Sequence, residues 1–200
     1  MNRRRVVDLF VEDRAHEELL RPLIERVSAA EEVEVEVRVR SALGGHGRAL
    51  EEFKLYQRLL EQGAAGGPHP DVVVVGIDGN CITFAEKRKE VVRATHAAFP
   101  DRVIAACPDP HVERWYLADP DSFKGVVGHR PTVGRKKCAR DHYKKLLADA
   151  VRRADQPPTL GGIEFAREIA AAIDKGDRSF RAFVDDLRGM LRAFREAAGR

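Results

Sequence analysis

The sequence predicts an α/β protein in which a mainly parallel four-stranded sheet is flanked by helices. Short apolar runs alternate with segments of helical periodicity across the first two-thirds of the 200 residues. One run, Asp71–Val75 (DVVVV), is apolar on both faces, as strands in the middle of a parallel sheet are. Beyond residue 120 no segment has strand character. We therefore expect residues 1–120 to form an α/β domain and residues 121–200 a helical C-terminal extension packed on it.

Four segments have the composition of strands. The first is mostly apolar, the second alternates charged and apolar residues without exception, and the last two are short and apolar. In chain order they are Arg5–Val11, Glu32–Arg40, Asp71–Val75 and Arg102–Ala106. Because a helical segment separates each consecutive pair, the pattern predicts βαβ units with parallel strands.

The predicted helices share apolar residues spaced three and four apart, which places these residues on one face. In chain order they are Ala15–Ala29, Arg48–Gln62, Ile82–Ala98, His111–Leu117, Asp141–Arg153, Gly162–Ile173 and Arg178–Ala198. Stretches rich in Gly and Pro, such as GAAGGPHP at residues 63–70, predict the connecting loops.

Composition excludes several classes of protein. With 35 basic and 32 acidic residues, the net charge of +3 does not by itself indicate a nucleic-acid binder. No apolar run approaches the ~18 residues of a membrane helix, so no membrane association is expected. Cys81, Cys107 and Cys138 are widely spaced and form no CxxC pair. This pattern disfavours a disulfide framework and a structural zinc site, and predicts a protein of the reducing cytoplasm.

Carboxylates follow three of the predicted strands. Glu12 follows the first, Asp78 the third, and Glu113 the turn after the fourth. Because active sites of open parallel sheets lie at the carboxyl ends of strands, we expect these residues to share one rim. Carboxylates that lie close together repel unless a cation such as Mg²⁺ or Mn²⁺ lies between them, and Asn80 would add an amide oxygen. The alternative is that these residues cap helices and form turns, as Asp78-Gly79-Asn80 does readily.

Three motifs resemble those of the TOPRIM (topoisomerase–primase) superfamily over about residues 5–120. A strand followed by Glu12 and a helix (VEDRAHEELLRPLI) resembles the first motif, and VVVVGIDGN resembles the strand that carries a DxD motif. PDPHVERWYLAD (Pro108–Asp119) is similar to the PxxExWLLAD motif of some small TOPRIM proteins and OLD-type nucleases. Those proteins are encoded beside ATPases in bacterial phage-defence loci.

The resemblance implies a TOPRIM-like (Rossmannoid) fold and a metal-dependent nuclease that cleaves DNA or RNA. Such a protein would be the effector of a bacterial antiviral defence system and would use Mg²⁺ or Mn²⁺. The resemblance also implies site roles: Glu12 organises the metal or acts as general base, Asp78 is a metal ligand, and Glu113 is the third acidic member.

Two departures from the family pattern favour a second hypothesis. Asp13 stands where family members usually have glycine, and the DxD motif is incomplete, with Gly76 before Asp78 and Asn80 after it. The protein would then be a degenerate, non-catalytic TOPRIM subunit that docks a partner ATPase of ABC or OLD type. A C-terminal helix face would supply the docking surface, unless it packs on the chain's own core. This face consists of Leu187, Met190, Leu191 and Phe194.

Charge is unevenly distributed along the chain. Residues 135–153 contain eight basic and two acidic residues, whereas residues 12–36 contain nine acidic residues and three arginines. Basic side chains near an acidic metal site suit nucleic-acid cleavage, because they hold the backbone phosphates. The candidates for this contact are Arg48, Arg135, Lys136, Lys137, Lys144 and Lys145. The alternative is a solvated helix face. His16 and His111 are further candidates near the rim, for proton transfer.

Overall fold

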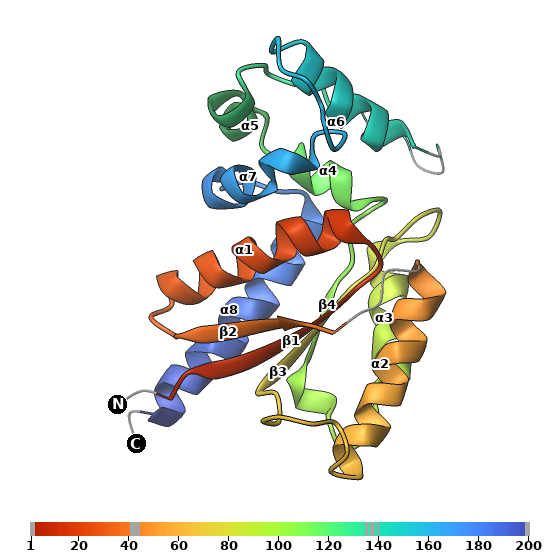
Figure 1. The fold of residues 1–200 in the computed structure, drawn as a ribbon, viewed down its shortest axis with the longest axis vertical. Coiled ribbons are helices and arrows are strands. Elements are labelled where there is room, and N and C mark those ends of the chain that lie inside the picture. The colour runs from red at the N-terminus through yellow and green to blue at the C-terminus, as the bar shows by residue number, and fades with distance from the viewer. Residues whose placement is uncertain (1–2, 41–44, 135, 137–138, 140, 199–200) are drawn as a thin grey trace.

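A four-stranded parallel sheet forms the centre of the protein (Figure 1). The computed structural model describes residues 3–40, 45–134, 136, 139 and 141–198. The strand order is β2-β1-β3-β4, and every neighbouring pair is parallel. The strands are β1 (Arg5–Val11), β2 (Val35–Val39), β3 (Val72–Gly76) and β4 (Val103–Ala106). The predicted α/β class is confirmed.

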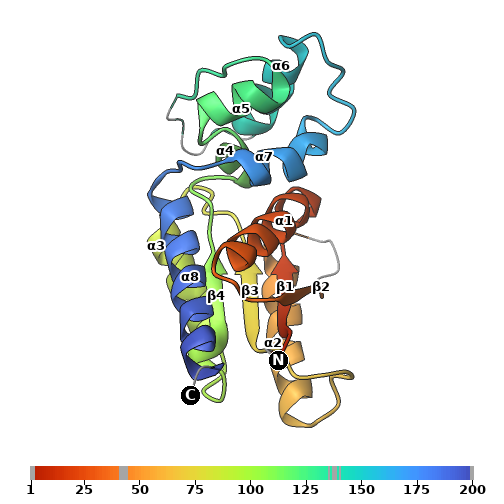
Figure 2. The same cartoon turned by 90° about the vertical axis from the view of Figure 1, so that its left-hand side faces the viewer.

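Helices cover both faces of the sheet (Figures 1 and 2). On one face lie α1 (Arg14–Ala30) and α8 (Arg178–Ala198), and on the other α2 (His46–Glu61) and α3 (Phe84–Ala94). Alternate valines of β3 belong to different apolar clusters, one on each face of the sheet. The four valines of the DVVVV run are consecutive because both faces of this strand are buried.

A group of short helices lies beyond the carboxyl ends of the strands (Figure 2). We call residues 112–172 the helical cap. It contains α4 (Val112–Tyr116), α5 (Pro120–Val127), α6 (His142–Arg152), a 3-10 turn (Ile163–Phe165) and α7 (Ala166–Ala172). Buried side chains of the cap join the same apolar cluster as α1, α8 and one face of the sheet. The cap is therefore packed on the carboxyl-end rim where the candidate site residues were expected.

Most predicted elements are confirmed, with ends within three residues of those observed. α3 is shorter than the expected Ile82–Ala98. It starts after Thr83, which caps it by accepting the N–H of Glu86, and it ends at Ala94, because the backbone of Thr95 is extended. α5 was not predicted. It starts at Pro120 behind the N-cap Asp119 and ends at Gly128, whose backbone is left-handed. In so short a helix, the capping residues Asp119 and Gly128 are the main sequence signal.

The face of α8 that was a candidate docking surface packs inside the protein. Leu187 and Leu191 are buried, and Met190 and Phe194 pack against the same cluster. This confirms the alternative that these residues serve the chain's own core. Among the described residues, no helix combines the length and the apolar character needed to cross a membrane.

Two cysteines differ in state. Cys81 is exposed and disulfide-bonded. The sequence pattern disfavoured a disulfide framework, whereas the structure has a disulfide at Cys81. Cys107 is a free, buried thiol, and burial raises its pKa to about 12.

Candidate metal and catalytic site

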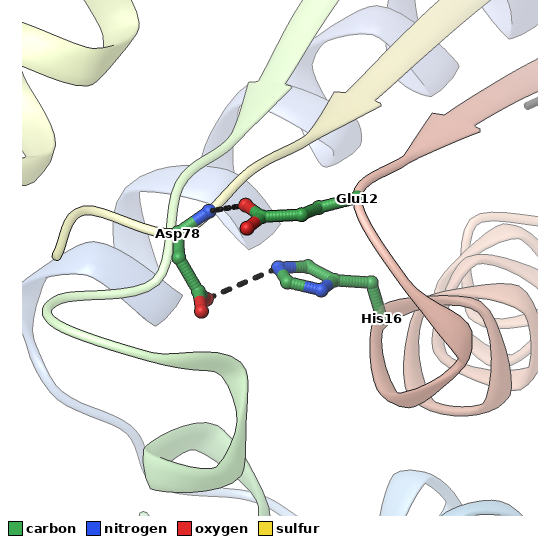
Figure 3. A group of neighbouring side chains, drawn as sticks. All are labelled: Glu12, His16 and Asp78. Carbon is green, nitrogen blue, oxygen red and sulfur yellow. Dashed lines mark hydrogen bonds and ion pairs between the residues drawn. The ribbon is translucent and has the colours of Figure 1, made fainter. Parts of the chain in front are cut away.

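The ends of β1 and β3 bring Glu12 and Asp78 together. The two strands are neighbours in the sheet, with Val11 opposite Gly76, so the residues that follow them leave the sheet side by side. The backbone N–H of Asp78 donates a hydrogen bond to Glu12 Oε2 at 3.0 Å (Figure 3). Two of the three acidic residues predicted for this rim, Glu12 and Asp78, are thus in contact, through the backbone N–H of Asp78.

His16 completes a group of three possible metal ligands. It lies in the first turn of α1 and is fully buried, and its Nε2 lies 3.2 Å from Asp78 Oδ1 (Figure 3). One potential ligand atom from each of Glu12, His16 and Asp78 lies within 4.8 Å of the others. Two carboxylates and one imidazole are a usual donor set for a divalent transition metal.

Asp13 fixes the orientation of the His16 ring. The Asp13 carboxylate caps α1 by accepting the backbone N–H of His16 at 3.1 Å. The same oxygen lies 2.8 Å from His16 Nδ1. With Nδ1 bonded to Asp13, Nε2 is directed toward Asp78. Histidines that bind metals are commonly oriented by a carboxylate in this way.

Asp78 is held as a carboxylate. It accepts the N–H of Val112 at 2.8 Å and lies 3.0 Å from His111 Nδ1, in addition to its ion pair with His16. Burial alone would raise the pKa of Asp78, but the charge of His16 and the bond from His111 hold it well below its ordinary value. Asp78 therefore carries a negative charge at neutral pH.

His16 is held as an imidazolium when no metal is bound. Burial alone would lower its pKa, but the carboxylates of Asp78 and Asp13 outweigh burial and raise it to about 10. A metal ligand must offer a lone pair, so a cation that binds Nε2 has to displace this proton.

Glu113 is a buried carboxyl without a hydrogen-bond partner on one oxygen. It is 3% exposed, and among the described residues its Oε2 has no hydrogen-bond partner. Its Oε1 lies 3.9 Å from Lys144 Nζ. Burial and the charge of Asp78 raise the pKa of Glu113. Glu113, Lys144, Asp13 and Leu160 are among the residues that line a pocket of 260 Å³. In the group of three possible ligands, His16 takes the place expected for Glu113.

Asn80 holds two loops together. Its backbone lies in the left-handed region, with φ of 51°, and its N–H donates to the carbonyl of Pro110 at 2.8 Å. The N–H of Gly79 donates to the carbonyl of Pro108 at 2.8 Å, and a Cβ at Gly79 would approach that same oxygen to 2.8 Å. These contacts match the turn role considered for Asn80, and they place Asp78 against His111. A role for Asn80 as a metal ligand stays a prediction.

The basic residues proposed for nucleic-acid contact lie in different places. Lys144 lies beside Glu113, and Lys136 lines a second pocket next to Pro110. Arg48 pairs with Glu52 at 3.0 Å on α2, and Lys145 is exposed on α6. Arg135 and Lys137 lie outside the described residues.

Much of the PDPHVERWYLAD motif has a structural role. Trp115 is fully buried and donates its indole N–H to Ser179 Oγ at 2.9 Å. The hydroxyl of Tyr116 donates to the carbonyl of Ala15 at 2.8 Å. Asp119 caps α5 and also accepts the N–H groups of residues 174 and 175. The motif thus fastens the cap to α1 and α8, whereas the Glu113 carboxyl makes no such tie.

The pairing of Asp13 with His16 was not predicted from the sequence. Asp13 was expected only as a departure from a family pattern, and His16 only as a candidate for proton transfer. A signal was present: an N-cap Asp followed three residues later by His places both side chains on one side of the first turn.

No protein-family model matches the chain, and neither a curated protein nor a solved structure matches it.

Proposed function

We propose that this protein is a metal-dependent nuclease of TOPRIM type that hydrolyses phosphodiester bonds in DNA or RNA. The observation that carries the proposal is the group formed by Glu12, His16 and Asp78 at the carboxyl ends of adjacent strands. The buried carboxyl of Glu113 lies close enough for the charge of Asp78 to raise its pKa. The motifs that resemble the family add support from the sequence and extend the proposal to an effector of antiviral defence.

The donor set fits a divalent cation. Glu12, Asp78 and His16 would hold it, and carboxylate oxygens suit Mg²⁺ and Mn²⁺ whereas an imidazole favours a transition metal. Mn²⁺ therefore fits this set better than Mg²⁺. When bound, such an ion polarises a phosphoryl oxygen and makes a bound water more acidic.

The remaining side chains have distinct tasks in the proposal. Asp13 orients His16, and His111 orients Asp78. Glu113, a carboxyl whose raised pKa favours the protonated form, donates a proton to the leaving oxygen. Lys144, whose Nζ lies in the same pocket, pairs with a non-bridging phosphate oxygen.

A cleavage assay tests the proposal. Supercoiled plasmid, single-stranded DNA and RNA are incubated with the protein and Mn²⁺, Mg²⁺ or EDTA. We expect cleavage with Mn²⁺, slower cleavage with Mg²⁺ and none with EDTA. Glu12→Gln and Asp78→Asn should each lower the rate at least roughly 100-fold, since each removes a charged ligand.

Asp121→Asn is the matched control, because Asp121 is an exposed carboxylate paired only with Arg130 among the described residues. It should cleave like the wild type. Equal activity in wild type and Glu12→Gln would exclude the role proposed for Glu12. Absence of Mn²⁺ binding in calorimetry would favour the non-catalytic subunit. A partner ATPase is proposed only from the family resemblance.

A further inference from the structure

A second pocket lies next to the candidate site, because the two share adjacent residues of the chain. It has a volume of 490 Å³ and lies between the start of α3, the start of α8 and residues 109–110. Pro110 lines this pocket, and the next residue, His111, contacts Asp78. The pocket has no part in the proposed metal site or in the proposed cleavage.

Three cationic side chains line the pocket: Arg114, Lys136 and Arg178. Arg114 is held in place, with its Nε 3.4 Å from Asp177 Oδ2. In the part of the chain that the structure describes, no carboxylate lies within ion-pair distance of Lys136 or Arg178. These two cations are therefore available to an anion.

The two acidic residues of the pocket, Asp109 and Asp177, do not cancel this charge. Asp177 is engaged at the start of α8, where its Oδ1 accepts hydrogen bonds from Ser179 N, Ser179 Oγ and Phe180 N. The lining contains three cationic and two acidic side chains, and one of the acids, Asp177, is already hydrogen-bonded at the start of α8. The net charge of the lining is therefore positive. The N-terminal end of α3 also lines the pocket and adds its partial positive charge.

Phe84 gives the pocket a flat aromatic wall. It is the first residue of α3 and is partly exposed, and the guanidinium of Arg178 lies 5.7 Å from its ring centroid. Proteins that bind single-stranded nucleic acids combine such rings, on which bases stack, with cations that hold the phosphates. Phe84, Arg178 and Lys136 bring these two components together in one pocket.

We propose that this pocket binds one nucleotide unit, with its base on Phe84 and its phosphate between Arg178, Lys136 and Arg114. The inference rests on the proposed function, because it identifies the substrate as a single strand whose next phosphate reaches Asp78. A duplex keeps its bases stacked inside and offers none to Phe84. A free mononucleotide has the same chemistry as one unit of the strand, so the test separates these two sources.

Binding is measured on the full chain carrying Asp78→Asn, which prevents cleavage during the experiment. Fluorescence anisotropy follows labelled single-stranded DNA, single-stranded RNA and duplex DNA of about 12 nucleotides, a length within the range of known single-strand sites. Calorimetry follows AMP as the mononucleotide. We expect at least one single strand to bind at least about tenfold more tightly than the duplex.

Two substitutions in the pocket test its contacts. Phe84→Leu keeps an apolar side chain but removes the aromatic face, and should weaken single-strand binding at least about fivefold. Arg178→Glu should weaken it at least as much and lower the salt dependence by about one phosphate contact. Arg58→Glu is the matched control. It makes the same charge change at an exposed site in the last turn of α2 and should leave the affinity within about twofold.

The single tryptophan verifies that the variants are folded. Trp115 packs against Phe180 and Phe183 and donates to Ser179, which itself lines the pocket. Its emission spectrum and the thermal midpoint should match those of the Asp78→Asn parent. If Phe84→Leu unfolds, the comparison of single-strand affinity between Arg178→Glu and Arg58→Glu still tests the inference.

Each outcome has one meaning. AMP binding that Phe84→Leu removes identifies a pocket for free nucleotides, and binding of the oligonucleotide alone identifies a pocket for a strand. Absence of binding by any nucleotide, equal losses in Arg178→Glu and Arg58→Glu, or unchanged affinity in both pocket variants overturns the inference. Wild-type cleavage with unaltered binding in the pocket variants would overturn the pocket alone. Pocket-dependent binding without Mn²⁺-dependent cleavage would overturn the nuclease alone.

Discussion

Asp78 connects more of the candidate site than any other single residue described above. Its carboxylate contacts His16, His111 and the backbone of Val112, and its N–H binds Glu12. The sequence predicted Glu12 and Asp78 because each follows a strand, and the position after a strand is readable from periodicity. The role of His16 as a possible metal ligand could not be predicted from the sequence, because it depends on the orientation that Asp13 gives to the imidazole ring.

The protonation of His16 makes the stability of the metal-free protein dependent on pH. Its folded-state pKa of about 10 lies above the ordinary value of 6.5. The stabilisation is therefore complete below about pH 6.5 and is lost as the pH rises through about 10. We expect the thermal midpoint of the wild type to fall between about pH 7 and 10 by at least about 5 °C more than that of His16→Gln.

The exposed His69 supplies the control for this measurement. His69→Gln should follow the wild-type curve at every pH. Parallel curves for wild type and His16→Gln would show that His16 is not held as an imidazolium.

Glu113 allows a structural role to be separated from a chemical one. Its Oε2 has no hydrogen-bond partner among the described residues, so replacing the carboxyl by an amide of the same shape breaks no hydrogen bond at that oxygen. We expect Glu113→Gln to keep or raise the thermal midpoint and to lower cleavage about 100-fold. Glu51→Gln, at an exposed site on α2, should change neither quantity. A lowered midpoint with unchanged specific activity would assign Glu113 to the structure alone.

At the scale of elements, the periodicity of apolar residues predicted most of the helices and strands. The element that it missed, α5, is defined by its capping residues instead. The alternating Glu32–Arg40 segment and the DVVVV run are both strands, because each matches the period of a sheet with one or two buried faces. α5 escaped prediction because its eight residues are too few to show a helical period. Its existence depends on a single N-cap, Asp119, and on tertiary contacts that no local pattern contains.

We expect Asp119 to hold the helical cap (residues 112–172) against the segment that precedes α8. It is 5% exposed, caps α5 and accepts the N–H groups of Asp174 and Lys175, which precede α8. Asp119→Ala removes the N-cap of α5 and leaves these N–H donors unpaired. We therefore expect the free energy of unfolding, measured with urea, to fall by about 1–3 kcal/mol. Asp121→Ala, at an exposed site on the same helix, should cause no measurable change. Equal stability of the two variants would contradict the role of Asp119.

At the scale of the whole molecule, the proposed nucleotide pocket combines residues that the sequence keeps far apart. Phe84, Arg114, Lys136 and Arg178 come from α3, α4, the segment before α6, and α8. Local patterns could not predict this pocket, because its assembly depends on how the cap and α8 pack on the sheet. The sequence did predict an acidic segment at residues 12–36 and a basic segment at residues 135–153. It could not show that only some of the basic residues lie next to the site.

Adjacent lysines on α6 can separate local contact from long-range attraction. Lys144 lies 3.9 Å from Glu113 and lines its pocket, whereas Lys145 is exposed outside it. Lys144→Gln and Lys145→Gln change the net charge equally, so both should lower kcat/KM at low salt. At about 0.15 M salt, charges beyond roughly 8 Å are screened, and Lys145→Gln should recover to the wild-type value. Lys144→Gln should remain about tenfold slower, because the contact proposed for Lys144 with the phosphate is direct. If both variants recover together, Lys144 attracts the nucleic acid without touching it.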